Sequence, residues 1–402
     1  LLTASIGIGC GEPLTEPTSD IEVGKRFVED REFRRNALEQ SVMNPDNSYS
    51  ALRLEEYARK QGGWDDLPVY NPSVLAVTTD DLGSFDATGR RASTGGGPTV
   101  SPELEWTHES LMDVGKWAFE NYPMIVDARL APVVASRQNA DEVGLWVDET
   151  GRLGGLVAAL DDGEDAVAWT CATCHAATDE SGALVLGRSN VTFDSGRLYR
   201  LGDAGSERID AWGAGRVDTS RDSTDNPVLI SDVRNIRHQS HLHHTATLRN
   251  SLAALAIRVE TLLIVSQRQE RRPPRDVAFA LAYYMWNFSP PTPTPVEEGR
   301  DVFEATCARC HHSDGSVAAP LDPAMVGTDA SLQNAPGRGT GRYRIPSLVG
   351  VSDRALLLHD GSVNGVEQLL DPARPTEIEG HEFGHELLVD ERERLLRFVR
   401  SL

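Results

Sequence analysis

The sequence has no excess of basic residues and no long apolar stretch. Its 402 residues include 39 Lys and Arg against 61 Asp and Glu, a formal net charge of −22. A nucleic-acid-binding protein needs a basic face, so this charge argues against nucleic acid as a partner and is compatible with a basic partner protein. No run of 18 apolar residues occurs, so the sequence predicts no membrane-spanning helix.

A phosphate-binding loop is also missing. The glycine-rich segment 87–102 does not follow a predicted strand, and no Lys-Ser or Lys-Thr pair comes after it. A loop that cradles phosphates needs both features. We expect this segment to be a flexible linker.

Cysteine is scarce, with five residues in the chain, and the first of them ends an unusual segment. Residues 1–10, small and apolar, resemble the tail of a secretory signal, and the small residue before Cys10 is typical of a bacterial lipoprotein processing site. We expect an exported protein of the periplasm or cell envelope. A lipid anchor on Cys10, export without an anchor and a lone structural thiol are the three alternatives for this residue.

The other four cysteines form two copies of C-x-x-C-H, 136 residues apart: Cys171, Cys174 and His175 in CATCH, and Cys307, Cys310 and His311 in CARCH. Residues three apart on a helical turn face the same side, with about 5–6 Å between their Cβ atoms. Two thiols so placed can form thioethers with the two vinyl groups of one haem, and the histidine that follows can reach the iron.

Other interpretations of these cysteines are weaker. The two cysteine pairs of a four-cysteine zinc site are normally closer together in the sequence, and such a site does not need a histidine after each pair. A thioredoxin-type pair does not explain two copies with histidine in the same place, and two structural cysteine pairs would match only by chance. The sequence therefore predicts two covalently bound haem c groups, with His175 and His311 as iron ligands.

Predicted helices frame each motif. Segments 111–123 and 275–288 enclose the first one, and segments 295–306 and 390–402 enclose the second. The last segment has apolar residues at the 3, 4, 7 spacing of an amphipathic helix. A first and a last helix beside a C-x-x-C-H turn are the layout of the cytochrome c fold. We therefore predict a mainly α protein with two cytochrome c-like haem domains in tandem.

This prediction divides the chain into four parts. Residues 1–10 are the signal-like tail, and residues 11–100 are a helical or irregular N-terminal extension with no assigned role. The first haem domain spans 101–290 and the second spans 296–402. The proline-rich segment 289–295, SPPTPTP, is the linker between them.

A different motif, H-E-x-x-H, is formed by His381, Glu382 and His385. On a helix it binds zinc in metalloproteases. Gly380 and Gly384 each cost about 1 kcal/mol inside a helix relative to alanine, and only 17 residues follow His385 to supply a third ligand. A loop before the last helix is the stronger prediction, and a zinc protease the weaker one.

The ligand opposite each motif histidine decides what the iron can do. For the second iron the downstream candidates are Met325, His359, His381 and His385, and His381 is the first choice. For the first iron, the segment RHQSHLHHTATLRN holds His238, His241, His243 and His244. We expect His241, ahead of His243, to be the ligand.

Part of the sequence resembles a known superfamily. Residues 343–370, with Pro-Ser-Leu before His-Asp-Gly-Ser, resemble bacterial di-haem cytochrome c peroxidases, and EGHEFGHELL with the last helix resembles the rubber-oxygenase branch. Tryptophylquinone-forming di-haem enzymes belong to the same superfamily. The resemblance covers 296–402 well, 100–290 loosely and 11–100 not at all. It implies His381 as distal ligand, and Arg342 and Arg344 as holders of haem propionates, with surface arginines as the alternative.

Two functions stay open. Peroxidases of this superfamily place a histidine about 16 residues after the first motif histidine, where this chain has Val191. That absence favours an exported di-haem electron-transfer protein over the alternative, a di-haem peroxidase- or oxygenase-like enzyme with an open first haem. For the first function we expect a redox partner protein that is basic. Trp169 and Trp286 either pass electrons between the haems or pack in the core.

Overall fold

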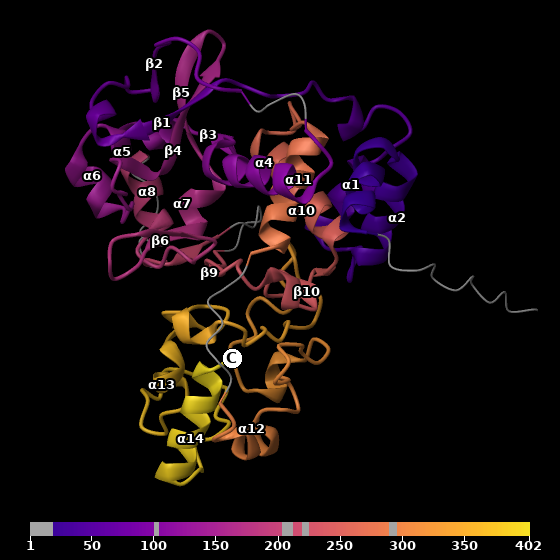
Figure 1. Ribbon diagram of the computed structural model, residues 1–402, viewed down its shortest axis with the longest axis vertical. Coiled ribbons are helices and arrows are strands. Elements are labelled where there is room, and N and C mark those ends of the chain that lie inside the picture. Colours follow the sequence, from indigo (N-terminus) through magenta and orange to yellow (C-terminus); the bar gives the residue numbers. More distant parts are fainter. Residues whose placement is uncertain (1–18, 100–103, 203–211, 219–224, 289–295) are drawn as a thin grey trace, which may run out of the picture.

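The structure is a computed structural model that describes residues 19–99, 104–202, 212–218, 225–288 and 296–402 (Figure 1). Cys10, the signal-like tail and the linker 289–295 lie outside the described residues. In Figure 1 the C-terminal helices lie below the rest of the molecule, and the hairpins around β9 and β10 lie between the two parts.

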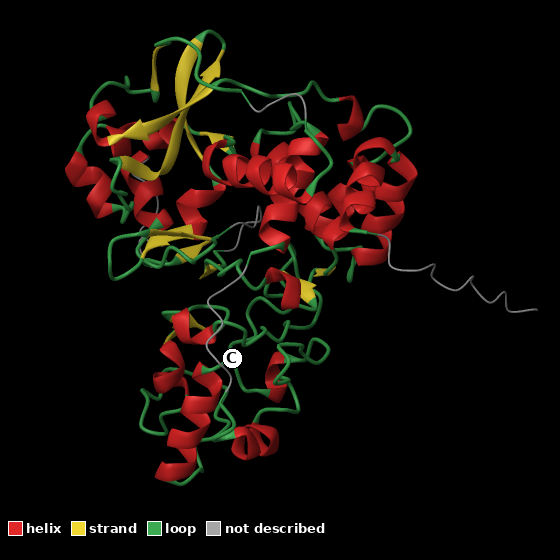
Figure 2. Ribbon diagram, viewed as in Figure 1, coloured by secondary structure: helices red, strands yellow, loops and turns green. Residues whose placement is uncertain are grey.

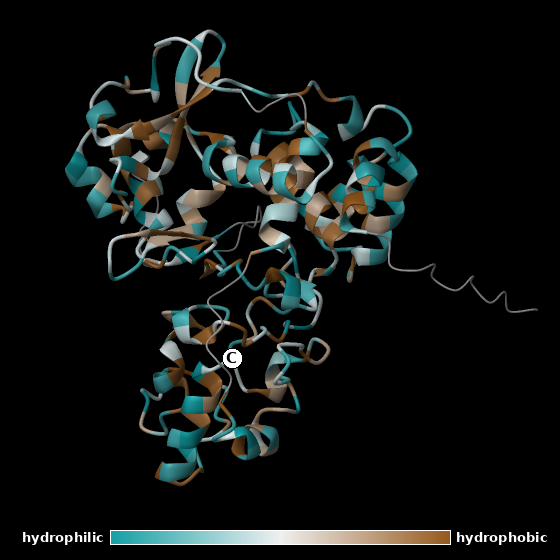
Figure 3. Ribbon diagram, viewed as in Figure 1, coloured by the Kyte–Doolittle hydropathy of each residue, from teal (hydrophilic) through white to brown (hydrophobic). Residues whose placement is uncertain are grey.

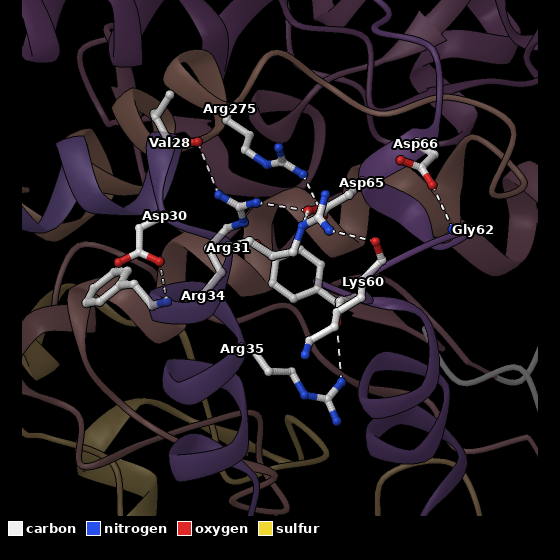
Figure 4. A network of polar contacts seen from close by, with 12 residues as sticks. Val28, Asp30, Arg31, Arg34, Arg35, Lys60, Gly62, Asp65, Asp66 and Arg275 are labelled. Atoms are coloured by element: carbon white, nitrogen blue, oxygen red, sulfur yellow. Dashed lines mark hydrogen bonds and ion pairs between the residues drawn. The ribbon is translucent and has the colours of Figure 1, made fainter.

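Three helices, α1 (Asp20–Glu29), α2 (Arg31–Ser41) and α3 (Ser48–Glu56), open the described chain. Each begins at a capping side chain, since Ser19, Asp30 and Asn47 accept hydrogen bonds from backbone N–H groups of the first turn. α1 and α2 pack on α10 (Leu252–Ser266), and α1 also packs on α11 (Arg275–Trp286). Arg53 of α3 donates to Thr261 Oγ1 of α10 at 2.9 Å. A buried network around Asp65 joins α2 to α11 (Figure 4).

A five-stranded antiparallel sheet follows, in the order β1 (Val74–Thr78), β4 (Arg152–Asp161), β5 (Glu164–Trp169) and β2 (Arg90–Ala92), with β3 (Ile125–Val126) also paired to β5. The β4–β5 turn has Asp162 and Gly163 at φ 53° and 86°, as a two-residue hairpin turn of type I′ requires. Leu156 and Ala158 pack with Val133 and Val134 of α5 (Ala131–Val134) on one face. Val157 and Ala159 pack near Trp117 on the other.

The predicted mainly α tandem of cytochrome c-like domains is wrong. One sheet combines β1 and β2, from the predicted helical or irregular extension, with β3, β4 and β5, from the predicted first haem domain, so these two predicted parts are not separate (Figure 2). The small apolar residues of β4, RLGGLVAALD, fit a strand as well as a helix, so their pattern does not distinguish the two structures. The segment 87–102 is correspondingly not only a linker, because it contains β2.

The longest helices form the centre of the molecule. α4 (His108–Asn121), α10 and α11 pack together, and Gly115 allows the closest approach, since a Cβ there would lie 2.1 Å from the carbonyl oxygen of Ala280. Figure 3 shows hydrophobic positions concentrated along β4, β5 and α11. This core holds α7 in place, because Ala172 and Ala176 belong to the same buried cluster.

The C-terminal part has a smaller core. Phe303 of α12 (Arg300–Thr306) meets Phe398 of α14 (Val389–Arg400) with ring centres 5.0 Å apart. Val366 of α13 (Gly365–Leu369) and Leu395 complete this cluster.

The remaining elements are short: α6 (Arg137–Glu142), α7 (Cys171–His175), α8 (Ser195–Gly202), β6 (Ala176–Thr178), β7 (Leu184–Leu186), β8 (Arg216–Val217), β9 (Val228–Leu229), β10 (His241–Leu242), β11 (Leu248–Arg249), β12 (Leu356–Leu357), β13 (Val363–Asn364), and 3-10 turns at Trp64–Asp66, Thr79–Asp81, Ala128–Leu130, Ile236–His238, Pro323–Met325 and Val351–Asp353.

One of these hairpins occurs twice. β12–β13 repeats β10–β11 at a distance of 115 residues, with Leu356 opposite Asn364 as His241 is opposite Arg249. The turns also correspond, since His243 and Leu358 have φ 64° and 66°. The copies exchange backbone hydrogen bonds: Leu229 N–H donates to His359 O at 2.8 Å, and Arg344 N–H donates to His244 O at 2.9 Å. Such reciprocal contacts are those of a two-fold-related pair.

Candidate haem sites

The first C-x-x-C-H motif forms the single-turn helix α7 directly after β5. Thr170 begins it, accepting from Ala172 N–H and donating to Gly155 O at 2.7 Å. Gly155 has φ 66°, and a Cβ there would lie 2.8 Å from Thr173 N, so this strand can lie against α7 only with glycine. Cys171 and Cys174 are free thiols, and burial raises the pKa of both to about 12.

The second motif follows α12 and closes a similar turn. His311 N–H donates to Cys307 O at 3.0 Å, which places Cys307, Cys310 and His311 on one helical turn. Cys307 and Cys310 are also free thiols, and burial raises the pKa of Cys307 to about 11. Both motifs therefore present two thiols and an imidazole from a single turn.

The two motif histidines are held in the same way. His175 Nδ1 donates to Ser231 O at 2.9 Å, and His311 Nδ1 donates to Pro346 O at 3.1 Å. Ser231 and Pro346 are themselves 115 residues apart, at matching positions of the duplicated segment. Because a carbonyl only accepts, Nδ1 carries the proton and Nε2 is the nitrogen with a lone pair for a metal. Burial lowers the pKa of His311 to about 3, so its ring is neutral.

His381 lies opposite His311, with ring centres 6.3 Å apart. A ligating imidazole nitrogen lies about 2 Å from a metal and each ring centre about 1 Å further out, so two imidazoles on opposite sides of one ion lie about 6 Å apart. The pair therefore fits an iron between the rings. Nδ1 of His381 is buried without a hydrogen bond. Leaving a buried polar nitrogen unpaired costs free energy, so packing alone is a poor explanation for a histidine at this position.

The backbone around His381 is tightly constrained. His381 has φ 55°, and its N–H donates to Val326 O at 2.7 Å. Gly380 has φ 80°, and a Cβ there would lie 2.4 Å from Thr328 N. Arg374 donates to Gly380 O. These contacts set the direction in which the imidazole points.

The other candidates for the second iron are engaged elsewhere. His385 Nε2 donates to Leu369 O at 3.1 Å. His359 packs against Tyr343 with tilted rings whose centres are 4.8 Å apart, and its Nε2 lies 3.4 Å from Asp329 Oδ2. Met325 is 59% exposed. The H-E-x-x-H segment consists of turns between α13 and α14, so the helix that a zinc protease uses is not formed.

The four clustered histidines have different surroundings. His241 Nε2 is buried without a partner, and Nδ1 lies 3.0 Å from Ser240 Oγ. His244 Nε2 donates to Leu229 O at 3.1 Å. His243 Nε2 accepts from Arg258 Nε at 2.6 Å, and its ring meets the Tyr49 ring edge-on at 5.0 Å.

Two of these histidines are linked to the first site: His244 Nε2 lies 3.3 Å from Ser231 Oγ, whose residue also accepts from His175, and His243 is linked through Arg258. Burial is the main cause of the lowered pKa of His175, and the positive charge of Arg258 acts in the same direction. That charge also acts on Cys171, so Arg258 lies near the motif. No interaction joins His241 to His175 within the described ranges, and His241 as a ligand stays a prediction.

The two predicted propionate-binding arginines, Arg342 and Arg344, differ in their surroundings. Arg342 is exposed and donates to Pro320 O at 3.2 Å. Arg344 is half-buried, lies 3.4 Å from Ser231 Oγ, and burial lowers its pKa to about 10. Among the described residues, no salt bridge joins Arg344 or Arg354 to a carboxylate. Burial lowers the pKa of Arg354 to about 10 as well, although the negative charge of Asp232 acts in the opposite direction. Desolvated guanidinium groups without a carboxylate in direct contact fit an anionic ligand such as haem propionates.

Sequence reasoning missed Arg354, and its setting in a short 3-10 turn offered no signal. The two tryptophans pack against other side chains. Trp169 meets Phe193 edge-on at 5.7 Å, and Arg237 lies over Trp286 at 5.8 Å. Their part in electron passage stays a prediction.

Comparison with protein-family models, curated proteins and solved structures gives no match to this chain. Within the described ranges, no three His, Cys, Asp or Glu side chains form a ligand group for a single metal ion. A haem iron, which takes four ligands from the porphyrin, needs only one or two from the protein. No helix of the described chain is long and apolar enough to cross a membrane.

Proposed function

We propose that the chain is an exported protein that binds two haem groups covalently and transfers electrons. The observation that carries this proposal is the 6.3 Å separation of the His311 and His381 ring centres, combined with the cysteine pair on the same turn as His311. When bound, each haem supplies an iron that gains and loses one electron reversibly.

The residues of the chain have distinct tasks in this proposal. Cys171 with Cys174, and Cys307 with Cys310, would each hold one haem through two thioether bonds to its vinyl groups. The carbonyls of Ser231 and Pro346 keep the Nδ1 protons in place and orient the rings. Arg344 and Arg354 would neutralise the propionate carboxylates of the haems.

The second site favours electron transfer over substrate chemistry. Imidazoles on both sides leave no position for a substrate, and the constrained backbone of Gly380 and His381 resists displacement of the ring. The protein around this site would then rearrange little when an iron there gains or loses an electron, and an electron-transfer protein requires this.

Absorption and magnetic spectra test this proposal. The protein is produced with a cytochrome c maturation system, and two covalent haems per chain are expected. Cys171→Ala with Cys174→Ala, and Cys307→Ala with Cys310→Ala, should each remove one. His381→Gly should convert one low-spin signal to high-spin, whereas the control His385→Gly should not. A colourless protein, or an unchanged spectrum of His381→Gly, would refute the assignment.

A second function is favoured by the first site. Arg258 holds His243 Nε2 close to the motif, and no histidine ring is paired with His175 within the described residues. A base and a guanidinium close to the motif would suit a peroxidase- or oxygenase-type oxidoreductase, because the His243 imidazole could accept a proton from a substrate. A high-spin signal that shifts on adding cyanide or peroxide would support this function, and two low-spin haems would exclude it.

A further inference from the structure

Large apolar side chains are exposed close to His381. In the described C-terminal part, Met325, Phe383, Leu388 and Val389 are between 41% and 68% exposed. Met325 and Phe383 line one cavity of about 670 Å³, together with Pro375 and Ile378. Such a group of exposed apolar side chains marks an interaction surface more often than an isolated one does.

This cavity is one layer of residues away from the second candidate haem site. The Phe383 ring meets the His381 ring edge-on, with centres 5.3 Å apart. Val326, also in the cavity wall, accepts the His381 N–H. His381 in turn faces His311 at 6.3 Å. A partner seated in the cavity would therefore lie close to the imidazole that is proposed to bind the iron.

The rim of the cavity is acidic. Residues 371–393 contain eight Asp and Glu and two Arg. Glu379 and Glu382 are exposed and line the cavity. Both arginines are directed at backbone carbonyls, since Arg374 donates to Leu369 O at 3.3 Å and Arg392 donates to Leu387 O at 2.9 Å.

We propose that this surface, the Met325–Phe383 cavity with its Glu379 and Glu382 rim, docks a small electron-transfer protein whose exposed redox edge is ringed by Lys or Arg. The proposal rests on the proposed function, because electrons must enter or leave through the second haem. An apolar centre with a charged rim is the usual composition of a transient interface. Charge complementarity selects a basic occupant and disfavours a second copy of this acidic chain.

The test is stopped-flow reduction of the oxidised holoprotein by a reduced, basic, single-haem cytochrome c. The variant Glu379→Gln with Glu382→Gln should lower the second-order rate constant about tenfold at low ionic strength, and the difference should vanish at high salt. The control, Glu149→Gln with Glu180→Gln, removes the same charge from exposed positions elsewhere and should change the rate little. Met325→Ala should weaken saturable binding, whereas Leu160→Ala, at another exposed apolar side chain, should not.

Two outcomes are distinguishable. If the variants keep the wild-type two-haem spectrum and both glutamate pairs lower the rate equally, the docking surface is wrong and the proposed function stands. Salt-independent rates, or self-association of the chain through this face, would also overturn the docking surface. A purified chain that carries no haem would overturn both proposals.

Discussion

Replacement of Asp65 by Asn should lower the free energy of unfolding by about 3 kcal/mol. The Asp65 side chain is 4% exposed and accepts from three guanidinium groups, those of Arg31 at 3.0 Å, Arg34 at 2.9 Å and Arg275 at 2.7 Å (Figure 4). Through these contacts Asp65 joins α2, which carries Arg31 and Arg34, to α11, which carries Arg275.

The magnitude depends on what each arginine keeps. Arg31 is 43% exposed and can be hydrated, and Arg275 still reaches Glu260 at 3.1 Å. Arg34, whose side chain is 3% exposed, loses its carboxylate and keeps only carbonyl acceptors. Removing one partner of a buried ion pair costs about 3–5 kcal/mol, and asparagine retains one acceptor, so we expect the lower end of this range.

Urea unfolding of the holoprotein, followed by far-ultraviolet circular dichroism, measures the effect. The matched control is Asp66→Asn, because Asp66 is exposed and its bond from Gly62 N–H at 2.7 Å can be made by the asparagine oxygen. The control should stay within about 0.5 kcal/mol of wild type. Equal midpoints for the two variants would refute the view that Asp65 is the required counter-charge. Because the pair is buried, 1 M salt should not remove the difference.

Two further predictions concern the second site and the sheet. Gly380→Ala should displace His381 and turn the second haem high-spin, because its Cβ would lie 2.4 Å from Thr328 N. Gly384→Ala is the control: Gly380 and Gly384 have φ 80° and 87°, so both variants carry the same backbone strain, but the Gly384 Cβ would meet nothing closer than 3.5 Å. This control should keep the low-spin spectrum, and identical spectra would contradict the assignment. Burial alone would raise the pKa of Asp161, but hydrogen bonds from Arg271 and Arg90 lower it overall. The folded pKa is thus below the unfolded value of about 3.9, so the stabilisation is present above that pH and is lost as the pH falls through the folded pKa. Urea midpoints at pH 6 and pH 3 should therefore differ more for wild type than for Asp161→Asn, and parallel shifts would contradict the prediction.

The two candidate sites differ in the residues that tertiary packing places opposite the motif histidine. At the second site a loop 70 residues downstream brings an imidazole to face His311. At the first site α10 follows the duplicated hairpin, and its residue Arg258 contacts His243. The two sites therefore hold the motif histidines in the same way, whereas the residues on the opposite side differ.

The sequence by itself determined the C-x-x-C-H turns and the closing helix of this protein. A C-x-x-C-H motif brings two thiols and an imidazole together within one helical turn, so five residues suffice to predict that arrangement, and the closing helix 389–400 follows from its apolar spacing. Only the tertiary structure decided the sheet, because strand pairing joins β1 to β4 across more than 70 residues and small apolar residues do not distinguish strand from helix. It also decided that His381 faces His311, and that carbonyls of Ser231 and Pro346 hold the motif histidines. These contacts depend on how distant segments pack, which no local pattern encodes.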